Sequence, residues 1–308
     1  MKVAALAGGT GAAKLLRGLA PLLPPGSLTV IGNTGDDAEL WGLHISPDLD
    51  TVCYTLAGLI DERKGWGLRD ETFHALEQMP RFGEPGWFGL GDRDLATHLH
   101  RTRRLREGEP LSAVTAGIAA ALGVPARVLP MSDRPVRTRI LGPEGWITFQ
   151  EYFVRDKAQT EVRAVEYAGA DVATPGPGVI EAIAEAHAVI VCPSNPITSI
   201  GPILAVPGFA RALAATDARV VAVSPIVGGE AVSGPAGRLM AMTRLPVSAT
   251  GVAQAYAAWL DVLIVDERDR GLTAEIAALG VKAVPAPTLM TDRATETALA
   301  RRVLECVG

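Results

Sequence analysis

Short, unbroken runs of apolar and often β-branched residues recur along the chain, and each run stops abruptly at glycine or small polar residues. Continuous runs of this kind are typical of parallel strands that are buried on both faces. In an open α/β sheet, ligands bind beyond the carboxyl ends of the strands. The polar residues after each run therefore mark the sheet edge at which we expect the chemistry. The five runs are 3–7, 28–32, 188–192, 220–223 and 263–265.

Helical patterns separate most of these runs. The alternation of strand and helix predicts right-handed βαβ crossovers and a mostly parallel sheet, and therefore an α/β fold. Ser46 followed by Pro47, with aspartates in the next turn, is a helix-start signal in which Ser46 is the N-cap. We expect helices at about 11–22, 47–60, 93–106, 112–122 and 292–306, and an irregular, glycine-rich stretch at 65–92.

Residues 125–170 differ from the rest, because strand-like segments follow one another there without helices between them. We interpret this region as an inserted β-rich subdomain or flap that ends in the linker-like sequence at 174–178. The predicted organisation is a first core part at 1–124, the insert at 125–178 and a second core part at 179–308.

The first run leads into a glycine-rich loop, Gly8, Gly9, Thr10 and Gly11, with Lys14 shortly after it. Glycines allow a tight turn and a close approach to a ligand, and the start of the next helix offers free N–H groups to a phosphate. The spacing is not that of a Walker A loop, and Lys14 replaces the third glycine of G-x-G-x-x-G. The loop indicates a nucleotide or another phosphate ligand. The alternative is a tight strand-to-helix turn without a ligand.

Four aspartates, Asp36, Asp37, Asp48 and Asp50, lie within fifteen residues on two adjacent segments of the predicted edge. Carboxylate oxygens, with phosphate oxygens beside them, are the ligands that Mg²⁺ prefers. The local alternative is that the first two shape a turn and the last two stabilise a helix N-terminus.

A further polar cluster opens the helix predicted at 93–106. Asp92 is a candidate helix cap, and Arg93 is a candidate to hold a phosphate through its forked guanidinium group. We interpret His98, alone on its helix, as a structural residue.

Polar side chains also follow the third and fourth runs. No His–Asp pair accompanies a serine there, so we interpret the serines as ligand-binding groups rather than nucleophiles. The residues concerned are Ser194, Asn195, Thr198, Ser199, Ser224 and Pro225. Aromatic residues are few, and Trp66, Trp87, Phe88, Tyr152 and Phe153 either mark a flat aromatic ligand or fill the core.

Composition narrows the class further. A formal net charge of −5 argues against a nucleic-acid or anionic-membrane surface. Three cysteines without metal-ligand or C-x-x-C spacing indicate buried, reduced thiols. No segment has the roughly 18 apolar residues of a membrane span and no secretion signal is evident, so we expect a cytoplasmic protein. The basic cluster Arg101, Arg103, Arg104 and Arg106 is expected to form a solvated helix face.

Taken together and in order, these segments resemble the 2-phospho-L-lactate transferase family of coenzyme F420 biosynthesis. The resemblance implies a Rossmann-like, three-layer core, a homodimer and a requirement for Mg²⁺. It also implies transfer of a phospho-lactyl or phospho-enolpyruvyl group from a guanosine diphosphate ester to the ribityl hydroxyl of the deazariboflavin Fo, with release of GMP. The matching stretches are 8–14, 33–37, 45–51, 90–98, 150–154, 193–201, 224–226, 233–237 and 288–291.

The resemblance also suggests roles for individual residues. Asp36 and Asp50 are the expected Mg²⁺ ligands, with Asp37 and Asp48 as alternates. Asp50 is a candidate to orient or deprotonate the Fo hydroxyl, and Arg93 to hold the transferred phosphate or the Fo side chain. The loops at 8–11 and 195–199 are expected to hold the guanosine diphosphate part, and Trp87, Phe88 and the insert to cover the deazaflavin ring. The other expected substrate-binding residues are Lys14, Asn33, Asp92, Ser194, Ser224 and Pro225.

Two other functions compete with this interpretation. The gluconeogenesis-factor family, which are nucleotide-sugar-binding regulators, shares the glycine-rich first loop and an Asn…Asp-Asp second strand end, but segments 90–98 and 193–201 favour the transferase. Gly9-x-Gly11 and the acidic second strand end suggest an NAD-dependent oxidoreductase, and the missing third glycine counts against it. The sequence does not choose between a lactyl and an enolpyruvyl donor.

Overall fold

Seven parallel strands form the central sheet of the computed structural model, which describes residues 1 to 308. Their order is β14-β13-β10-β9-β1-β2-β5, and every neighbouring pair is parallel. From β1 the chain adds β2 and then β5 on one side of the sheet. It then returns to the other side of β1 and adds β9, β10, β13 and β14 in turn, so the strand order reverses between β1 and β9 as in Rossmann-like folds. The strands are β1 (Val3–Ala7), β2 (Leu28–Gly32), β5 (Arg127–Pro130), β9 (Ala188–Val191), β10 (Arg219–Val223), β13 (Val262–Asp266) and β14 (Lys282–Ala286).

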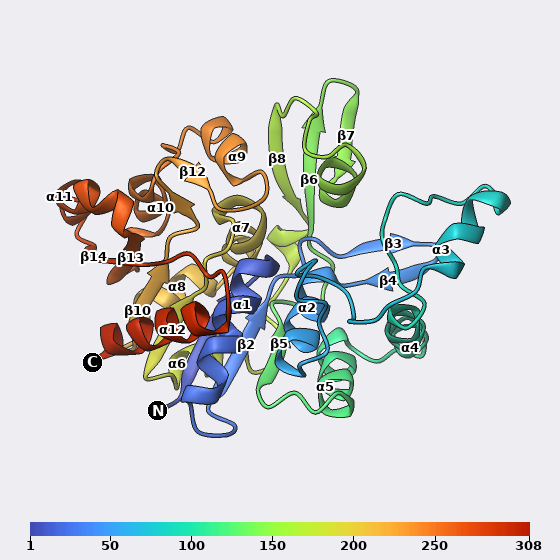
Figure 1. Cartoon of the computed structure of the whole chain (residues 1–308), viewed down its shortest axis with the longest axis horizontal. Helices are drawn as coiled ribbons and strands as arrows, with labels where there is room; N and C mark the ends of the chain where they lie inside the picture. The colour runs from blue at the N-terminus through green and yellow to red at the C-terminus, as the bar shows by residue number, and fades with distance from the viewer.

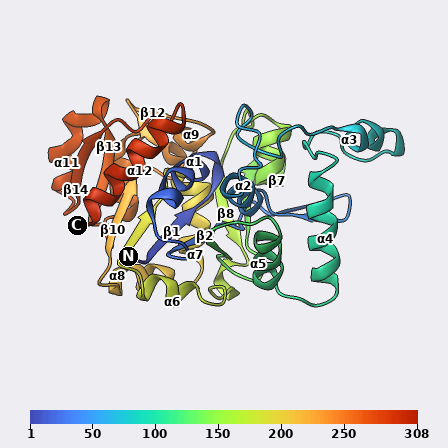
Figure 2. The same cartoon turned by 60° about the horizontal axis from the view of Figure 1, so that its bottom comes forward.

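Alternate residues of each strand face opposite helical layers. On β1, Val3 and Ala5 belong to one buried cluster, whereas Ala4 and Leu6 belong to the other. The predicted three-layer α/β core with a mostly parallel sheet is therefore confirmed (Figures 1 and 2). The first layer contains α1 (Gly9–Leu19), α2 (Pro47–Leu56), α5 (Leu111–Ala121) and α12 (Arg293–Val307), and the second contains α6 (Val179–Ala184), α7 (Gly201–Ala205), α8 (Phe209–Ala215), α9 (Ala236–Met242), α10 (Ala249–Tyr256) and α11 (Thr273–Ala277).

An antiparallel sheet of three strands forms the predicted insert, with the order β7-β6-β8. Its strands are β6 (Arg137–Gly142), β7 (Gly145–Thr148) and β8 (Ala164–Ala168), and a helical turn, Glu151–Arg155, links the last two. The predicted boundary at residue 125 differs from the structure in one respect, because β5 pairs with β2 in the central sheet rather than with the insert.

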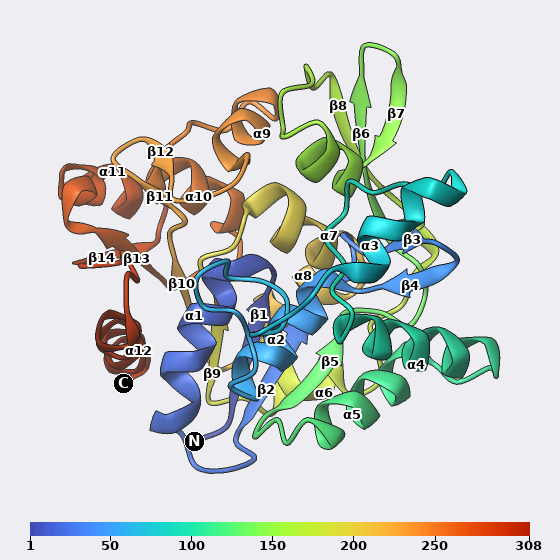
Figure 3. The ribbon, with the colours of Figure 1, turned by 45° about the vertical axis from the view of Figure 1, so that its right-hand side comes forward.

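A second projection stands apart from the central sheet (Figures 1 and 3). It contains the hairpin β3 (Ala38–Leu40) and β4 (Leu43–Ile45), the short helix α3 (His74–Gln78) and the long helix α4 (Asp94–Arg106). The hairpin is absent from the prediction, α3 lies inside the stretch predicted to be irregular, and α2 ends four residues before the predicted end at about 60. A further hairpin, β11 (Ile226–Val227) and β12 (Glu230–Ala231), follows β10.

No single helix is long and apolar enough to cross a membrane. A bent pair, Pro196–Ala205 and Phe209–Ala215, passes the test of length and composition, and Ile200, Ile203, Phe209 and Leu213 of this pair are buried in the core.

The contact between α1 and α12 offers a direct test of the packing. A Cβ atom added at Gly18 would lie 2.4 Å from the carbonyl oxygen of Glu296 on α12. We expect Gly18→Ala to lower the free energy of unfolding by about 1–3 kcal/mol, because the added methyl group overpacks this crossing. The measurement is urea unfolding.

The matched control is Gly117→Ala in α5, where an added Cβ atom would meet nothing within 4 Å. There the usual gain of about 0.5–1 kcal/mol for alanine over glycine in a helix is expected. A stabilising effect of Gly18→Ala would contradict the close helix crossing.

Candidate active site

The loops that follow β1 and β9 lie side by side at the carboxyl edge of the sheet. The backbone N–H of Gly8 donates to Ser194 Oγ at 3.3 Å. Gly11 approaches the second loop so closely that a Cβ atom there would lie 2.4 Å from the carbonyl oxygen of Pro193. The two loops meet where the strand order reverses, which is the place where open α/β sheets bind ligands.

A carboxylate occupies the N-terminus of α1. The backbone N–H of Gly9 donates to Asp48 Oδ1 at 2.7 Å, and the side-chain amide of Asn33 donates to Asp48 Oδ2 at 2.9 Å. Asn33 is itself oriented, because its Oδ1 accepts from the N–H of Gly35 at 2.8 Å. Asp48 thus joins the start of α1, the end of β2 and the first turn of α2. One N–H group that the sequence predicts for a phosphate is here bonded to a carboxylate.

The carboxyl group of Asp36 lies close enough to that of Asp48 for the two to repel each other when both are ionised. Its side chain is buried, and its Oδ1 has no hydrogen-bond partner. Desolvation and then repulsion from Asp48 raise the pKa of Asp36 well above its ordinary value. Desolvation likewise raises the pKa of Asp48 to about 6. A buried carboxylate without a partner is costly, so this pair of carboxylates favours a bound proton or cation.

Asp37 connects this group to the β3–β4 hairpin. Its Oδ2 accepts from Ser46 Oγ at 3.1 Å and lies 3.0 Å from His44 Nε2, whereas its Oδ1 is buried without a partner. Ser46 stands at the N-cap position of α2 but makes no side-chain capping bond. The predicted capping role of Ser46 is therefore wrong, because its hydroxyl is used to hold Asp37.

Asp50 belongs to a different set of side chains. Both of its oxygens accept from the guanidinium group of Arg101 on α4, one of them from Nη1 at 3.0 Å. His98 lies beside this pair, with Nδ1 3.8 Å from Asp50 Oδ2 and Nε2 3.2 Å from Asp94 Oδ2. Of the four aspartates, Asp50 is therefore the one that hydrogen-bonds Arg101, although Asp37 lies near enough to interact electrostatically with the same guanidinium group.

The expectation for Arg101 is corrected here. Only 1% of its surface is exposed, so it is not part of a solvated helix face, although Arg103 and Arg104 are paired with glutamates at the surface. The missed signal is the spacing of Asp94, His98 and Arg101, which places all three on one face of a helix. The sequence pattern also does not identify His44, which contacts Asp37, or Tyr54, which bonds Asp94, as residues of the site.

Arg93 stands at the N-cap position of α4, where its Nη1 donates to the carbonyl oxygen of Arg69 at 2.9 Å. The predicted capping of this helix by Asp92 is wrong. Glu71 accepts from the N–H groups of Arg93 and Asp94, while Asp92 accepts from the N–H groups of His74 and Ala75 at the start of α3. Asp92 therefore orders the segment in front of α4 rather than α4 itself.

The loop after β9 is shaped by its own side chains. Asn195 Oδ1 accepts from the N–H groups of Ile197 and Thr198, and the Thr198 carbonyl accepts from the amide of Asn33 at 3.2 Å. Ser199 is buried and lies against Gly8. Ser224 is bonded within its own turn, because its Oγ donates to the carbonyl of Ile226 and accepts from the N–H of the same residue, with Pro225 between them.

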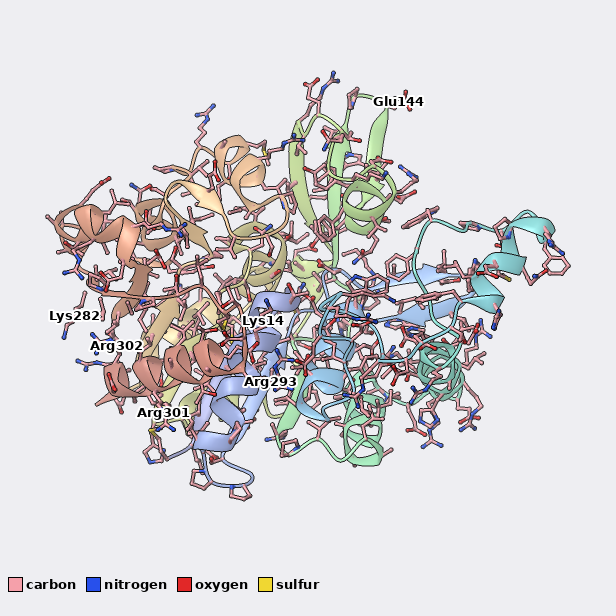
Figure 4. The ribbon with its side chains drawn as sticks, viewed as in Figure 1. Lys14, Glu144, Lys282, Arg293, Arg301 and Arg302 are labelled. Carbon is pink, nitrogen blue, oxygen red and sulfur yellow. The ribbon has the colours of Figure 1, made fainter.

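Two residues in the first turns of α1, Thr10 and Lys14, contact neighbouring segments. Lys14 Nζ donates to the carbonyl oxygen of Met290 at 3.0 Å, near the start of α12, where Figure 4 also shows Arg293. A Cβ atom at Gly65 would lie 3.4 Å from Thr10 Cγ2, so the segment around Gly65 covers Thr10.

The candidate aromatic residues fall into two groups. Trp87 and Phe88 meet edge to face at 5.8 Å, and Phe88 packs on the buried residues Leu40, Ile45 and Leu90 of the second projection. In the insert, Phe153 stacks on Phe149 at 5.5 Å and remains 41% exposed, whereas Tyr152 is buried. Glu144 marks the outer tip of the insert (Figure 4).

No group of three or more His, Cys, Asp or Glu side chains is arranged to hold a metal ion. Mg²⁺, however, usually takes only one or two carboxylates from the protein and completes its shell with water and substrate phosphate. The unpartnered oxygens of Asp36 and Asp37, in a cluster where desolvation raises the pKa of two carboxyl groups, fit such a cation.

Comparison with known proteins covers the whole chain. The sequence model of the family described as 2-phospho-L-lactate transferase CofD matches residues 3–292. A phosphoenolpyruvate transferase of Streptomyces griseus is 47% identical, with 99% of this chain and 98% of the relative covered. A 2-phospho-L-lactate transferase of Methanosarcina mazei is 43% identical, with 97% and 98% covered.

Among solved structures, a protein of the UPF0052 family from Bacillus halodurans superposes with a TM-score of 0.65. The comparison covers 98% of both chains at 21% identity, and this likeness supports the fold alone.

The buried carboxylates predict how stability depends on pH in the absence of divalent cations. A carboxyl group whose pKa is raised by folding binds its proton more tightly in the folded state, so its stabilising contribution is complete below the unfolded pKa and is lost as the pH rises through the folded value. For Asp48 the contribution is lost between pH 3.8 and about 6, where its folded pKa lies. For Asp36, whose pKa is raised well above 3.8, the loss also begins at that pH and continues to higher pH. We expect Asp36→Asn to melt about 2–4 °C higher than wild type near neutral pH and to show a flatter dependence on pH.

The measurement is thermal unfolding in chelator across this range. The exposed Asp171→Asn, which removes a carboxylate of the same type from the surface, should reproduce the wild-type curve. Parallel curves for Asp36→Asn and wild type would show that Asp36 does not carry the raised pKa.

Proposed function

This chain belongs to the 2-phospho-L-lactate transferase family, and we propose that it transfers a phospho-lactyl or phospho-enolpyruvyl group from a guanosine diphosphate ester to Fo. The ribityl hydroxyl of Fo forms a new bond to the phosphorus that carries the lactyl or enolpyruvyl group. The bond between this phosphorus and the bridging oxygen of the diphosphate breaks, so that GMP leaves with the bridging oxygen and the hydroxyl proton is released. The observation that carries this proposal is the cluster of Asp36, Asp37 and Asp48 where the loops after β1, β2 and β9 meet.

The donor would lie along the glycine-rich loop and the loop after β9. Gly8, Gly9, Thr10 and Gly11 supply a backbone that a diphosphate can approach closely. Asn195, Thr198 and Ser199 stand across from it, and Ser194 already joins the two loops through Gly8. Ser224 and Pro225 are proposed to close the far side of the nucleotide, and Lys14 to contribute positive charge to this side of the site.

Mg²⁺ is proposed to bind at Asp36, with Asp37 or Asp48 beside it. When bound, it would neutralise the diphosphate and polarise the phosphorus that is attacked. Asp50, also predicted as a metal ligand, already bonds Arg101 with both oxygens, whereas Asp36 and Asp37 each have one buried oxygen without a partner. The roles of Asn33 and Ser46 are to hold Asp48 and Asp37 in place.

The acceptor is proposed to lie toward Asp50 and Arg93. Asp50 would orient or deprotonate the ribityl hydroxyl, and Arg93 would hold the transferred phosphate or the ribityl chain. Trp87, Phe88 and the insert, with exposed Phe153, would cover the deazaflavin ring. A homodimer and a cytoplasmic location complete the proposal on the basis of family membership.

Asp36→Asn tests the assignment of the cation. At saturating Mg²⁺ we expect turnover to fall about 100-fold, equivalent to about 2.7 kcal/mol of transition-state stabilisation, because the amide cannot replace the anionic ligand. The assay contains Fo, Mg²⁺ and each guanylylated donor, with the product identified by mass spectrometry. Asp171→Asn is the control, and turnover of Asp36→Asn within about threefold of wild type would remove Asp36 from the metal site.

The same preparation separates the competing functions. Fo together with GDP should raise the melting temperature by mass action, whereas a UDP-sugar and nicotinamide nucleotides should not. Stabilisation by a UDP-sugar alone would favour a nucleotide-sugar-binding regulator.

Arg93→Ala tests the acceptor side. Loss of charge-assisted hydrogen bonds to the substrate should raise the KM for Fo or lower kcat/KM by about 10–100-fold. Arg103→Ala, on the same helix but paired with Glu107 at the surface, is the matched control and should behave as wild type. Unchanged kinetic constants for Arg93→Ala would exclude Arg93 from the site.

A further inference from the structure

A cluster of buried polar side chains joins α2 to α4. Asp50 and Tyr54 are four residues apart on α2, and Asp94, His98 and Arg101 share one face of α4. All five side chains are buried. The Tyr54 hydroxyl lies 2.5 Å from Asp94 Oδ1, and Asp94 Oδ2 lies 3.2 Å from His98 Nε2. The two helices are therefore joined at two levels, at Tyr54–Asp94 and at Asp50–Arg101.

Arg101 is bonded to one carboxylate. Its Nη1 and Nη2 donate to the two oxygens of Asp50, its Nη1 lies 3.3 Å from His98 Nδ1, and its Nε has no partner. A fully buried guanidinium group is tolerated only beside a compensating charge, and a two-point bond fixes the plane of the carboxylate as well as its position. The orientation of Asp50 in this structure is therefore set by Arg101.

The same helix carries Arg93 at its start. Because α4 is anchored to α2 at both levels, the Asp50–Arg101 pair and the Tyr54–Asp94 bond together fix the start of α4, and with it Arg93, relative to Asp50. The second projection has no strand in the central sheet, so α4 is held by side-chain contacts: these bonds, the contact of His44 N–H with Thr102 Oγ1, and the packing of Leu95 and Leu105 on buried apolar clusters.

We propose that Arg101 is a positioning residue for the acceptor half of the reaction. It touches no substrate and acts by holding Asp50 in the orientation that meets the acceptor hydroxyl, at a fixed distance from Arg93. The proposal rests on the proposed function. It predicts that a change at Arg101 affects the acceptor, whereas the donor, held by the loops after β1 and β9, is unaffected.

The first test is Arg101→Lys, which keeps the buried charge but replaces the two-point bond by a single point. We expect a folded protein whose kcat/KM for Fo falls about tenfold or more, with the KM for the guanylylated donor unchanged. Arg103→Lys on the same helix is the control and should match wild type. Wild-type kinetics for Arg101→Lys, or a KM for the guanylylated donor that rises as much as the KM for Fo, would overturn the proposal.

A double-mutant cycle tests whether Arg101 acts through Asp50. If it does, Asp50→Asn and the double variant Asp50→Asn with Arg101→Lys should have the same kcat/KM for Fo, because the second change has nothing left to misplace. Independent, multiplying losses would overturn the proposal. A second readout covers poor folding of these variants. Millimolar guanidinium should raise the acceptor turnover of Arg101→Ala and leave the wild-type turnover of Arg103→Ala unchanged, and the absence of rescue in folded Arg101→Ala would overturn the proposal.

These outcomes are distinct from failure of the proposed function. If wild-type protein transfers no phospho-acid to Fo, the proposed function fails. If wild type is active and Arg101→Lys is equally active, only the role of Arg101 fails.

Discussion

The hydrogen bonds of Asp48 are the constraint on which the site depends. This carboxylate bonds the first turn of α1 and the amide of Asn33, and so fixes three segments that come from two strands and a helix. Its position also makes the site electrostatically demanding, because Asp36 is buried beside it and lacks a partner for one oxygen. The fold thus buries neighbouring carboxyl groups at the edge of the sheet, which is an arrangement that a bound proton or cation relieves.

The site has two parts with different supports. The proposed donor part stands on the central sheet, where neighbouring strands fix the loops after β1 and β9. The proposed acceptor part stands on α2 and α4, which are joined by buried side-chain bonds rather than by strand pairing. Such a division suits a reaction with two chemically unlike substrates, because each half can be adjusted without disturbing the other.

Much of the core could be predicted from sequence, because strands buried on both faces leave uninterrupted apolar runs. The bounds of β1 and β2 agree with the prediction. The β3–β4 hairpin was missed because each strand is only three residues long, which is too short for the alternation of apolar and polar residues to stand out. Strand β5 was assigned to the insert because it directly precedes the insert in sequence, although it pairs with β2.

The site was only partly predictable for a physical reason. Local sequence shows which aspartates lie close together along the chain, but not which partner each one meets in space. Asp92 looked like a cap for α4 and instead orders α3, and Arg101 looked solvated because three other arginines follow it within five residues. The assignments of metal ligands and substrate-binding residues stay predictions.

The placement of β1 has a consequence for how the chain reaches its native state. The backbone N–H of Lys2 donates to His187, 185 residues later, and β1 pairs with β9 along its length. During synthesis, one flank of the first strand therefore waits unpaired until more than half of the polypeptide has been made, and such non-local parallel pairing is slow to form. An exposed apolar edge of this kind invites association between nascent chains. The seam between β1 and β9 is thus a late-assembling part of the molecule, and the two loops that meet there come together only after this pairing has formed.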